Sequence, residues 1–143
     1  MNKIILTFLI ATLFSNCKKN DQIKDRFSNY ELISTKEQII EIKHIKWAAT
    51  DRPTFVTQEN YNAKSSDASL IDYCFYLDTK ENRFQFFSEK NREKLQNGGT
   101  VRVSGKFYKT KKFDGSFPYK NFLVYSFTPK NGYFIVFVCD TIL

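Results

Sequence analysis

The sequence predicts a mainly β domain with one short helix. Aromatic residues make up 17% of the 143 residues, with 15 Phe and 8 Tyr, and such residues favour strands. Turn-forming residues separate short apolar runs at fairly regular spacing. Only one segment, from Ser88 to Gly99, carries clear signals for both ends of a helix.

The first 16 residues are typical of an export signal. Lys3 supplies a positive charge, and residues 4–14 form an apolar run. This run is too short for a membrane-spanning helix, which takes about 20 apolar residues, but it suits a signal peptide. We therefore expect residues 1–16 to be removed, so that Cys17 begins the mature chain.

The residues around the expected cleavage site, Leu13-Phe14-Ser15-Asn16-Cys17, resemble the lipobox of bacterial lipoproteins. The resemblance implies that the Cys17 thiol receives a diacylglyceryl group. It also implies a lipid-anchored protein of the bacterial cell envelope, at the periplasmic face or in the outer membrane. An ordinary signal peptide or an uncleaved anchor is the alternative. Residues 17–30 are expected to be a lipidated tether, because residues 18–26 are too polar to bury a core.

Residues 31–143 have the length of a single domain. Their first apolar run, residues 39–49, fits either a helix or a strand. Ile39, Ile42 and Ile45 recur at helical spacing, whereas the abundance of β-branched Ile favours a strand. We favour a long strand that continues as residues 54–57, followed by a polar loop over residues 59–69.

Two further strands are predicted over residues 70–78 and 83–88, because a short polar connection suited to a hairpin separates them. Ser88 is then a natural N-cap for a short helix. Gly98 and Gly99 end this helix, at positions where a positive φ is needed.

The remaining strands are predicted over residues 100–108, 122–128 and 133–139. Val101 and Val103 alternate with polar residues, until Gly105 marks a bulge or a bend. Residues 109–117 form a basic loop. The last two strands are joined through Asn131-Gly132, which is a strong turn signal.

Three strands, a short helix and two further strands, in that order, resemble the OB fold, a five-stranded Greek-key barrel. The resemblance covers roughly residues 37–128 and is most specific from Phe84 to Phe107. It implies a small OB-fold-like barrel of five to six antiparallel strands, with the helix between the third and fourth strands. Residues 133–139 depart from this pattern, so a sandwich or an open α+β sheet is the alternative.

Assigning Cys17 to lipid leaves Cys74 and Cys139 as an even pair in an oxidising compartment. They form either a disulfide or two separately buried thiols, and the sequence does not decide between these alternatives.

Basic and aromatic residues gather late in the chain, which has a net charge of +7. Cations beside stackable rings suit anionic or planar ligands, and OB-fold proteins commonly bind ligands at this segment. A solvated basic loop near anionic lipid headgroups is the alternative. The candidate residues for binding a ligand or partner are Arg102, Lys106, Tyr108, Lys109, Lys111, Lys112, Phe113 and Tyr119.

No catalytic, nucleotide-binding or metal-binding motif is present, and His44 is the only histidine. We therefore expect no enzymatic activity, no metal and no cofactor. The least favoured alternative is a hydrolase that uses scattered carboxylates such as Asp72 and Asp78.

These observations predict a membrane-anchored envelope lipoprotein that acts as a non-catalytic binding or structural module. Its expected partner is another envelope protein or an anionic polymer. One alternative is an immunity or inhibitor protein that neutralises a toxin or a hydrolase at the membrane. A second alternative is an OB-type binder of nucleic acid or polysaccharide, although an envelope protein rarely meets nucleic acid.

Overall fold

The computed structural model describes residues 27–47, 52–64, 68–79, 87–111, 129 and 131–143. The chain divides into two units, Met1–Tyr30 and Glu31–Leu143. In the first unit, the described residues 27–30 form a turn in which the Tyr30 amide donates to the Phe27 carbonyl (3.0 Å).

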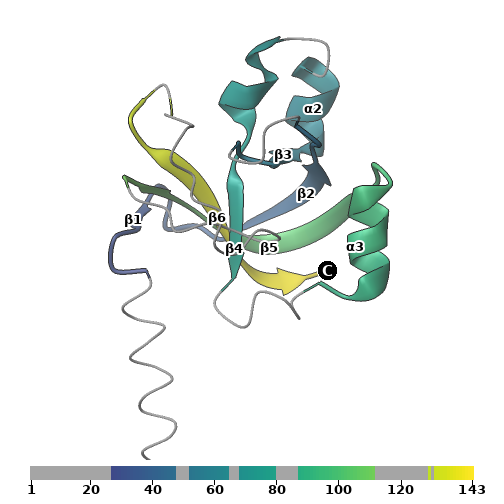
Figure 1. Ribbon diagram of the computed structural model, residues 1–143. Coiled ribbons are helices and arrows are strands. Elements are labelled where there is room, and N and C mark those ends of the chain that lie inside the picture. Colours follow the sequence, from purple (N-terminus) through teal and green to yellow (C-terminus); the bar gives the residue numbers. More distant parts are fainter. Residues whose placement is uncertain (1–26, 48–51, 65–67, 80–86, 112–128, 130) are drawn as a thin grey trace, which may run out of the picture. The chain divides into compact units, whose positions relative to one another are not determined.

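The second unit contains a six-stranded mixed sheet (Figure 1). The main path through the sheet is β3-β2-β5-β6-β4, and β1 pairs with β5 off this path. The pairing of β4 with β6 is parallel, and the other ladders between the described strands are antiparallel. The strands are β1 (Glu31–Leu32), β2 (Gln38–His44), β3 (Phe55–Thr57), β4 (Tyr76–Thr79), β5 (Thr100–Thr110) and β6 (Phe134–Ile142).

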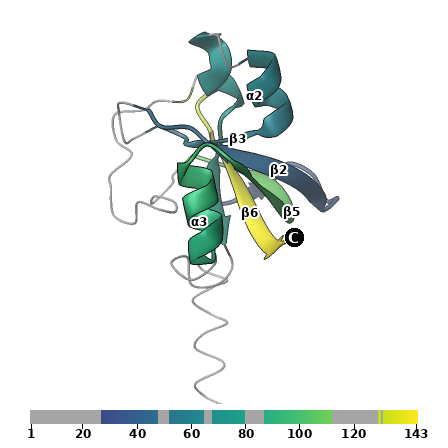
Figure 2. The same ribbon diagram turned by 90° about the vertical axis from the view of Figure 1, so that its right-hand side faces the viewer.

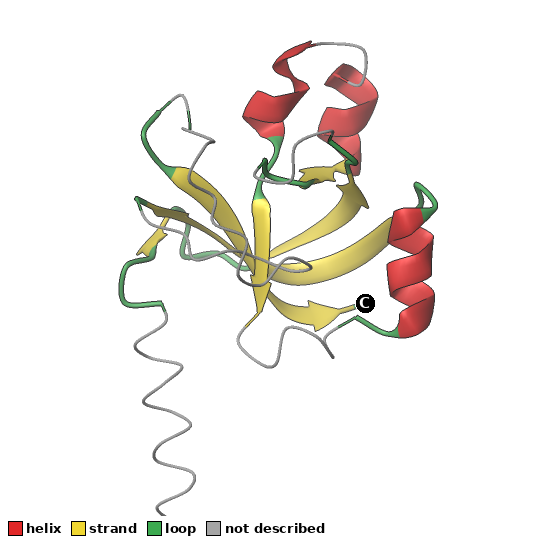
Figure 3. Cartoon of the chain, viewed as in Figure 1, coloured by secondary structure: helices red, strands yellow, loops and turns green. Residues whose placement is uncertain are grey.

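Two α-helices, α2 (Gln58–Lys64) and α3 (Glu89–Gln96), and a 3-10 helix, η1 (Ala68–Tyr73), accompany the described strands. Figures 2 and 3 show α2 and η1 beside each other, near the end of β2 and apart from α3. The α3 boundaries predicted from the sequence are confirmed. The Ser88 hydroxyl accepts a hydrogen bond from the Asn91 amide (3.3 Å), and Gly98 after the helix has a φ of 80°.

The predicted OB-like antiparallel barrel is wrong, and the fold is a mixed α/β unit with an open sheet. In the described residues, the two ends of the sheet path meet only at one isolated bridge, between Phe55 and Phe75. The physical reason lies in residues 70–78, which were predicted to be a single strand. Much of this run forms η1, which leaves only four residues in β4. A short apolar run fits a buried strand and a buried helical turn equally well.

The predicted first strand is confirmed as β2, although it ends at His44. Residues 54–57 do not continue it, because β3 turns back and pairs with β2 in antiparallel orientation. The polar loop predicted over residues 59–69 is wrong for the described part of this range, since residues 59–64 belong to α2 and residues 68–69 to η1. Residues 83–86 and 122–128, predicted to be strands, lie outside the described residues, and Phe87 and Ser88 are not in a strand.

The main core is built from side chains of β2 to β6 and of α3, and it is rich in aromatic rings that contact one another. The Phe107 and Phe137 ring centroids are 4.7 Å apart, and those of Phe75 and Phe107 are 5.1 Å apart. Ten buried residues form this main core: Ile42, Phe55, Phe75, Leu77, Phe87, Leu95, Val101, Val103, Phe137 and Cys139.

A second, smaller cluster lies beside α2 and η1, and we call it the helical-end cluster. It contains three buried residues, Val56, Leu70 and Cys74, against which Ile45, Trp47 and Tyr61 pack. No residue of α2 itself is buried, so this helix covers the cluster only with partly exposed side chains.

Cys74 and Cys139 are both free thiols, so the disulfide alternative is not formed. They belong to different clusters, Cys74 to the helical-end cluster and Cys139 to the main core. The parallel register pairs Cys139 with Thr79, five residues beyond Cys74. At about 3.3 Å per residue, this offset is far larger than a disulfide can bridge.

The bulge predicted at Gly105 is confirmed, since the register of β5 against β6 shifts between Ser104 and Gly105. A Cβ atom at Gly105 would collide with the backbone carbonyl of Val138, so only glycine permits this close approach. Beyond the bulge, Phe107 packs against the main core. Because side chains alternate along a strand, Lys109 extends from the same face of β5 as Phe107.

Candidate functional site

The strongest candidate site lies where β5 ends and β6 begins. Lys109 of β5 is paired with Ile135 of β6 in the register of the sheet, which places it close to Tyr133, just before β6. The Nζ atoms of Lys109 and Lys111 lie 5.3 and 5.7 Å from the centroid of the Tyr133 ring. Two ammonium groups therefore lie over one aromatic ring. The quadrupole of the ring attracts both cations and keeps them close together.

Lys109 is also held from the opposite edge of β5. Its Nζ atom lies 3.0 Å from the Glu31 carboxylate of β1, and the exposed fractions of the two side chains are 34% and 67%. The hydrogen bond to Glu31 and its negative charge raise the pKa of Lys109, and the group is therefore a cation throughout the neutral range. Glu31 orients this cation without burying it, so Lys109 stays accessible to an anion.

A recess of about 450 Å³ lies next to this pair of cations. Its volume is in the range of sites that hold small ligands or single side chains. The described residues that line it come from η1, β4, β5 and β6 and from the segments that precede β3, β4 and β6: Pro53, Ile71, Asp72, Cys74, Tyr76, Lys109, Pro129, Asn131, Tyr133, Phe134 and Ile135.

The lining of the recess is mainly apolar. The Tyr76 and Phe134 rings meet edge to face with centroids 5.9 Å apart. The Cys74 thiol donates to the Leu70 carbonyl (3.3 Å), and burial raises the pKa of Cys74 to about 12. The thiol is therefore neutral near pH 7 and contributes an apolar surface instead of a nucleophile.

The predicted binding residues are only partly brought together. Lys109 and Lys111 meet at Tyr133, whereas Arg102 lies exposed near the other end of β5. Lys106 and Tyr108 are half-buried and, by alternation, point to the face of β5 opposite Lys109. The other three predicted residues, Lys112, Phe113 and Tyr119, lie outside the described residues.

Sequence reasoning missed Tyr133, although it identified both of its cationic neighbours. Tyr133 follows the Asn131-Gly132 turn, where Gly132 has a φ of 71°. That turn signal predicts the start of a strand, but only the β5–β6 register shows that this start lies beside Lys109.

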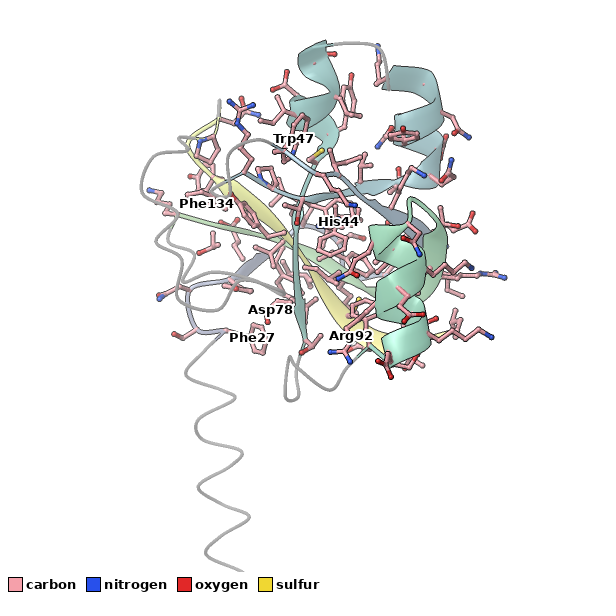
Figure 4. All side chains as sticks on the ribbon, turned by 45° about the vertical axis from the view of Figure 1, so that its right-hand side comes forward. Phe27, His44, Trp47, Asp78, Arg92 and Phe134 are labelled. Carbon is pink, nitrogen blue, oxygen red and sulfur yellow. The ribbon has the colours of Figure 1, made fainter. Side chains whose placement is uncertain are left out.

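Further cation–aromatic pairs surround the helical-end cluster. The Lys43 Nζ lies 4.7 Å from the Tyr61 ring centroid, and Lys64 lies 5.8 Å from that of Tyr73. The Trp47 indole donates to the Pro53 carbonyl (2.7 Å), which ties it to a residue of the recess. Figure 4 shows Trp47 in the part of the unit that carries α2 and η1, and Arg92 and Asp78 in the other part.

His44 does not form a catalytic or metal-binding constellation with other described residues. Its ring packs edge to face against Phe55 (5.4 Å), and both ring nitrogens are buried without a hydrogen-bond partner. Burial, followed by the positive charge of Lys46, lowers the pKa of His44. No group of three or more His, Cys, Asp or Glu side chains that would suit a metal ion occurs among the described residues.

The two carboxylates singled out from the sequence do not share a site. Asp72 lines the recess and is the only carboxylate among its described lining residues. Asp78 of β4 is fully buried, and its carboxylate accepts a hydrogen bond from the Thr79 amide (2.8 Å). The recess thus lacks, in its described lining, the pair of acids that a hydrolase of this kind would need.

Comparisons with protein-family models, with curated proteins and with solved structures find no match. None of the helices in the described part of the chain has the length and apolar character needed to cross a bilayer. A function can therefore be inferred only from the arrangement of this protein's own side chains.

Proposed function

We propose that this protein is an envelope lipoprotein, anchored through Cys17, whose Glu31–Leu143 unit is a non-catalytic binding module for an acidic partner. The observation that carries the proposal is the placement of Lys109 and Lys111 over Tyr133, beside an apolar recess that Lys109 and Tyr133 line. The partner is another envelope protein or an anionic polymer of the envelope.

Electrostatics support an acidic partner in two ways. The net charge of +7, or +6 once Lys3 is removed with residues 1–16, draws anionic molecules toward the protein over long range and so raises the rate of association. The pair of cations at Tyr133 then supplies a local site, because both ammonium groups can donate hydrogen bonds to one carboxylate or sulfate. A site of this kind binds more weakly as salt is added.

Fluorescent poly-L-glutamate and dextran sulfate are suitable probes for this site. The charge reversal Lys109→Glu with Lys111→Glu should weaken binding of an acidic probe by about tenfold or more, since each lost charge contact contributes on the order of 1 kcal/mol. Fluorescence anisotropy at low and high salt measures the change.

The matched control is Lys90→Glu with Lys94→Glu on α3, because both lysines are exposed and the change in net charge is the same. Equal losses of binding in the two double variants would mean that net charge alone attracts the probes, and the proposed site would then be wrong.

The lipid anchor has its own test. The Cys17→Ser variant should lose labelled fatty acid and move from the detergent phase to the aqueous phase on phase separation. A variant that still carries labelled fatty acid would contradict the assignment of Cys17.

A further inference from the structure

The recess beside Tyr133 combines apolar surface with charged groups, and this combination favours some acidic partners over others. Its apolar surface comes from Ile71 and Cys74 on one side and from Phe134 and Ile135 on the other. Ile135 is 37% exposed although it is a large hydrophobic residue, whereas Cys74 and Tyr76 are 7% and 4% exposed. The recess thus combines a buried apolar base with an exposed apolar wall, which an apolar group of a ligand could cover.

The charges of the recess are asymmetric. Lys109 lies on the β5 side, with Lys111 close by over the same ring, and Asp72 lies on the η1 side. The two lysines therefore attract an acidic group toward β5, and an apolar group fills the remaining space. A ligand that satisfies both needs carries an apolar group and a carboxylate a few ångströms apart.

Peptides meet this requirement better than polysaccharides do. Neighbouring residues of a peptide present an apolar side chain and a carboxylate at such a spacing. A polysaccharide would instead use exposed ring faces and polar side chains, but two ammonium groups already lie over the Tyr133 ring. The described lining also offers few uncharged polar side chains, Asn131 and the tyrosine hydroxyls.

We infer that the recess binds an apolar side chain of a partner protein, from a segment in which an acidic residue that pairs with Lys109 and Lys111 lies next to it. The inference rests on the proposed function and narrows it from any acidic partner to an acidic–apolar peptide. Ile135 and Ile71 contact the apolar side chain, and the two lysines set its orientation by attracting the neighbouring carboxylate toward β5.

The probe is a fluorescein-labelled peptide of alternating Glu and Phe residues, and binding is measured by anisotropy on the full-length protein. Two related peptides, with Ala in place of Phe and with Gln in place of Glu, test the two requirements separately. Each should bind about tenfold more weakly than the Glu–Phe peptide. A poorly filled apolar pocket reduces the affinity by about this factor, and so does the loss of the charge pairs with Lys109 and Lys111.

The variant that tests the recess is Ile135→Thr, which keeps a β-branched residue in the strand but removes apolar surface. Its matched control is Ile39→Thr, because Ile39 is 57% exposed on β2 and does not line the recess. Ile135→Thr should weaken binding of the Glu–Phe peptide by about tenfold. Ile39→Thr should leave it unchanged.

Hydrogen exchange provides a second readout on the unmodified protein. The bound peptide should slow amide exchange in η1 and at the start of β6, which line the recess, as measured by mass spectrometry. The amides of α3 serve as the internal control, because no residue of α3 is among the described lining residues, and their exchange should not respond to the peptide.

The outcomes separate this inference from the proposed function. If the Phe and Ala peptides bind equally and exchange in η1 is not slowed, while Lys109→Glu with Lys111→Glu still weakens binding, the inference is wrong and the acidic site stands. If dextran sulfate slows exchange in η1 and at the start of β6 as much as the Glu–Phe peptide does, an anionic polymer occupies the recess and the inference is overturned.

Discussion

The main core and the helical-end cluster differ in how they are held together. The main core contains ten buried residues, and the Phe75, Phe107 and Phe137 rings interlock at its centre. The helical-end cluster contains three buried residues, and α2, which packs beside it, buries none. Around this second cluster, two half-buried lysines and an exposed arginine lie over Tyr61, Tyr73 and Trp47.

This difference places the candidate site on the less well-packed part of the unit. Cys74 belongs to the helical-end cluster and also lines the recess, whereas no residue of the main core is among the described lining residues. Segments with few buried apolar contacts open at low free energy, which suits a surface that must receive a partner. We therefore expect the main core to set global stability and the helical end to set local opening.

Phe137→Ala should have the largest effect of any single change considered. Phe137 is fully buried and contacts two other rings, so its removal leaves a large cavity. The free energy of unfolding should fall by about 3 to 5 kcal/mol, as measured by urea denaturation. Ile39→Ala is the control, because Ile39 is exposed, and it should change stability by less than about 0.5 kcal/mol.

Leu70→Ala should have a smaller and more local effect. Leu70 is buried in the helical-end cluster, which is small enough to collapse partly around a cavity. The free energy of unfolding should fall by about 2 kcal/mol, near the lower limit for such substitutions. Hydrogen exchange should accelerate in α2 and η1 more than in β5 and β6. Equal acceleration in all four elements would show that the two clusters unfold as one.

Ser88→Ala should destabilise α3 by about 1 kcal/mol, because the Ser88 hydroxyl satisfies the Asn91 amide at the helix N-terminus. Ser88→Asp is the matched control, since aspartate also caps a helix and should retain most of the stability. Leu95 anchors α3 to the main core, so the loss should appear in global unfolding. An effect confined to α3 would contradict this coupling.

The smallest expected effect is a pH dependence that originates at His44, where β2 pairs with β3. The pKa of His44 is lowered by burial and by Lys46, so the unfolded chain binds the proton more readily than the folded chain. Neutral His44 therefore contributes fully to the free energy of unfolding above its ordinary pKa of 6.5. This contribution is lost as the pH falls from 6.5 toward the lower pKa of His44 in the folded protein. Solvent screening keeps it modest, because the side chain is only partly buried.

Urea denaturation between pH 7.5 and pH 5 tests this contribution, with His44→Gln as the reference that cannot titrate. His44 is the only histidine, so no other imidazole contributes in this interval. The unsubstituted protein should lose more stability on acidification than His44→Gln does. Parallel pH profiles of the two proteins would rule out the proposed role of His44.

The sequence by itself determined the features that depend on neighbouring residues. The limits of α3 follow from the Ser88 cap and from the positive φ at Gly98, and the bend in β5 follows from Gly105. The cationic half of the candidate site, Lys109 and Lys111, was also identified from the sequence. These features are predictable because capping, turn geometry and charge act within a few residues of the chain.

Only the tertiary structure decided how distant segments meet. The parallel pairing of β4 with β6 and the open sheet depend on where residues 70–79 find partners, and an apolar run does not encode that choice. The sequence also does not encode the contact of Tyr133 with Lys109, which depends on the β5–β6 register. Nor does it encode the separation of Cys74 and Cys139 into different clusters. Strand pairing depends on packing between residues far apart in the sequence, so the candidate site was complete only once the sheet had formed.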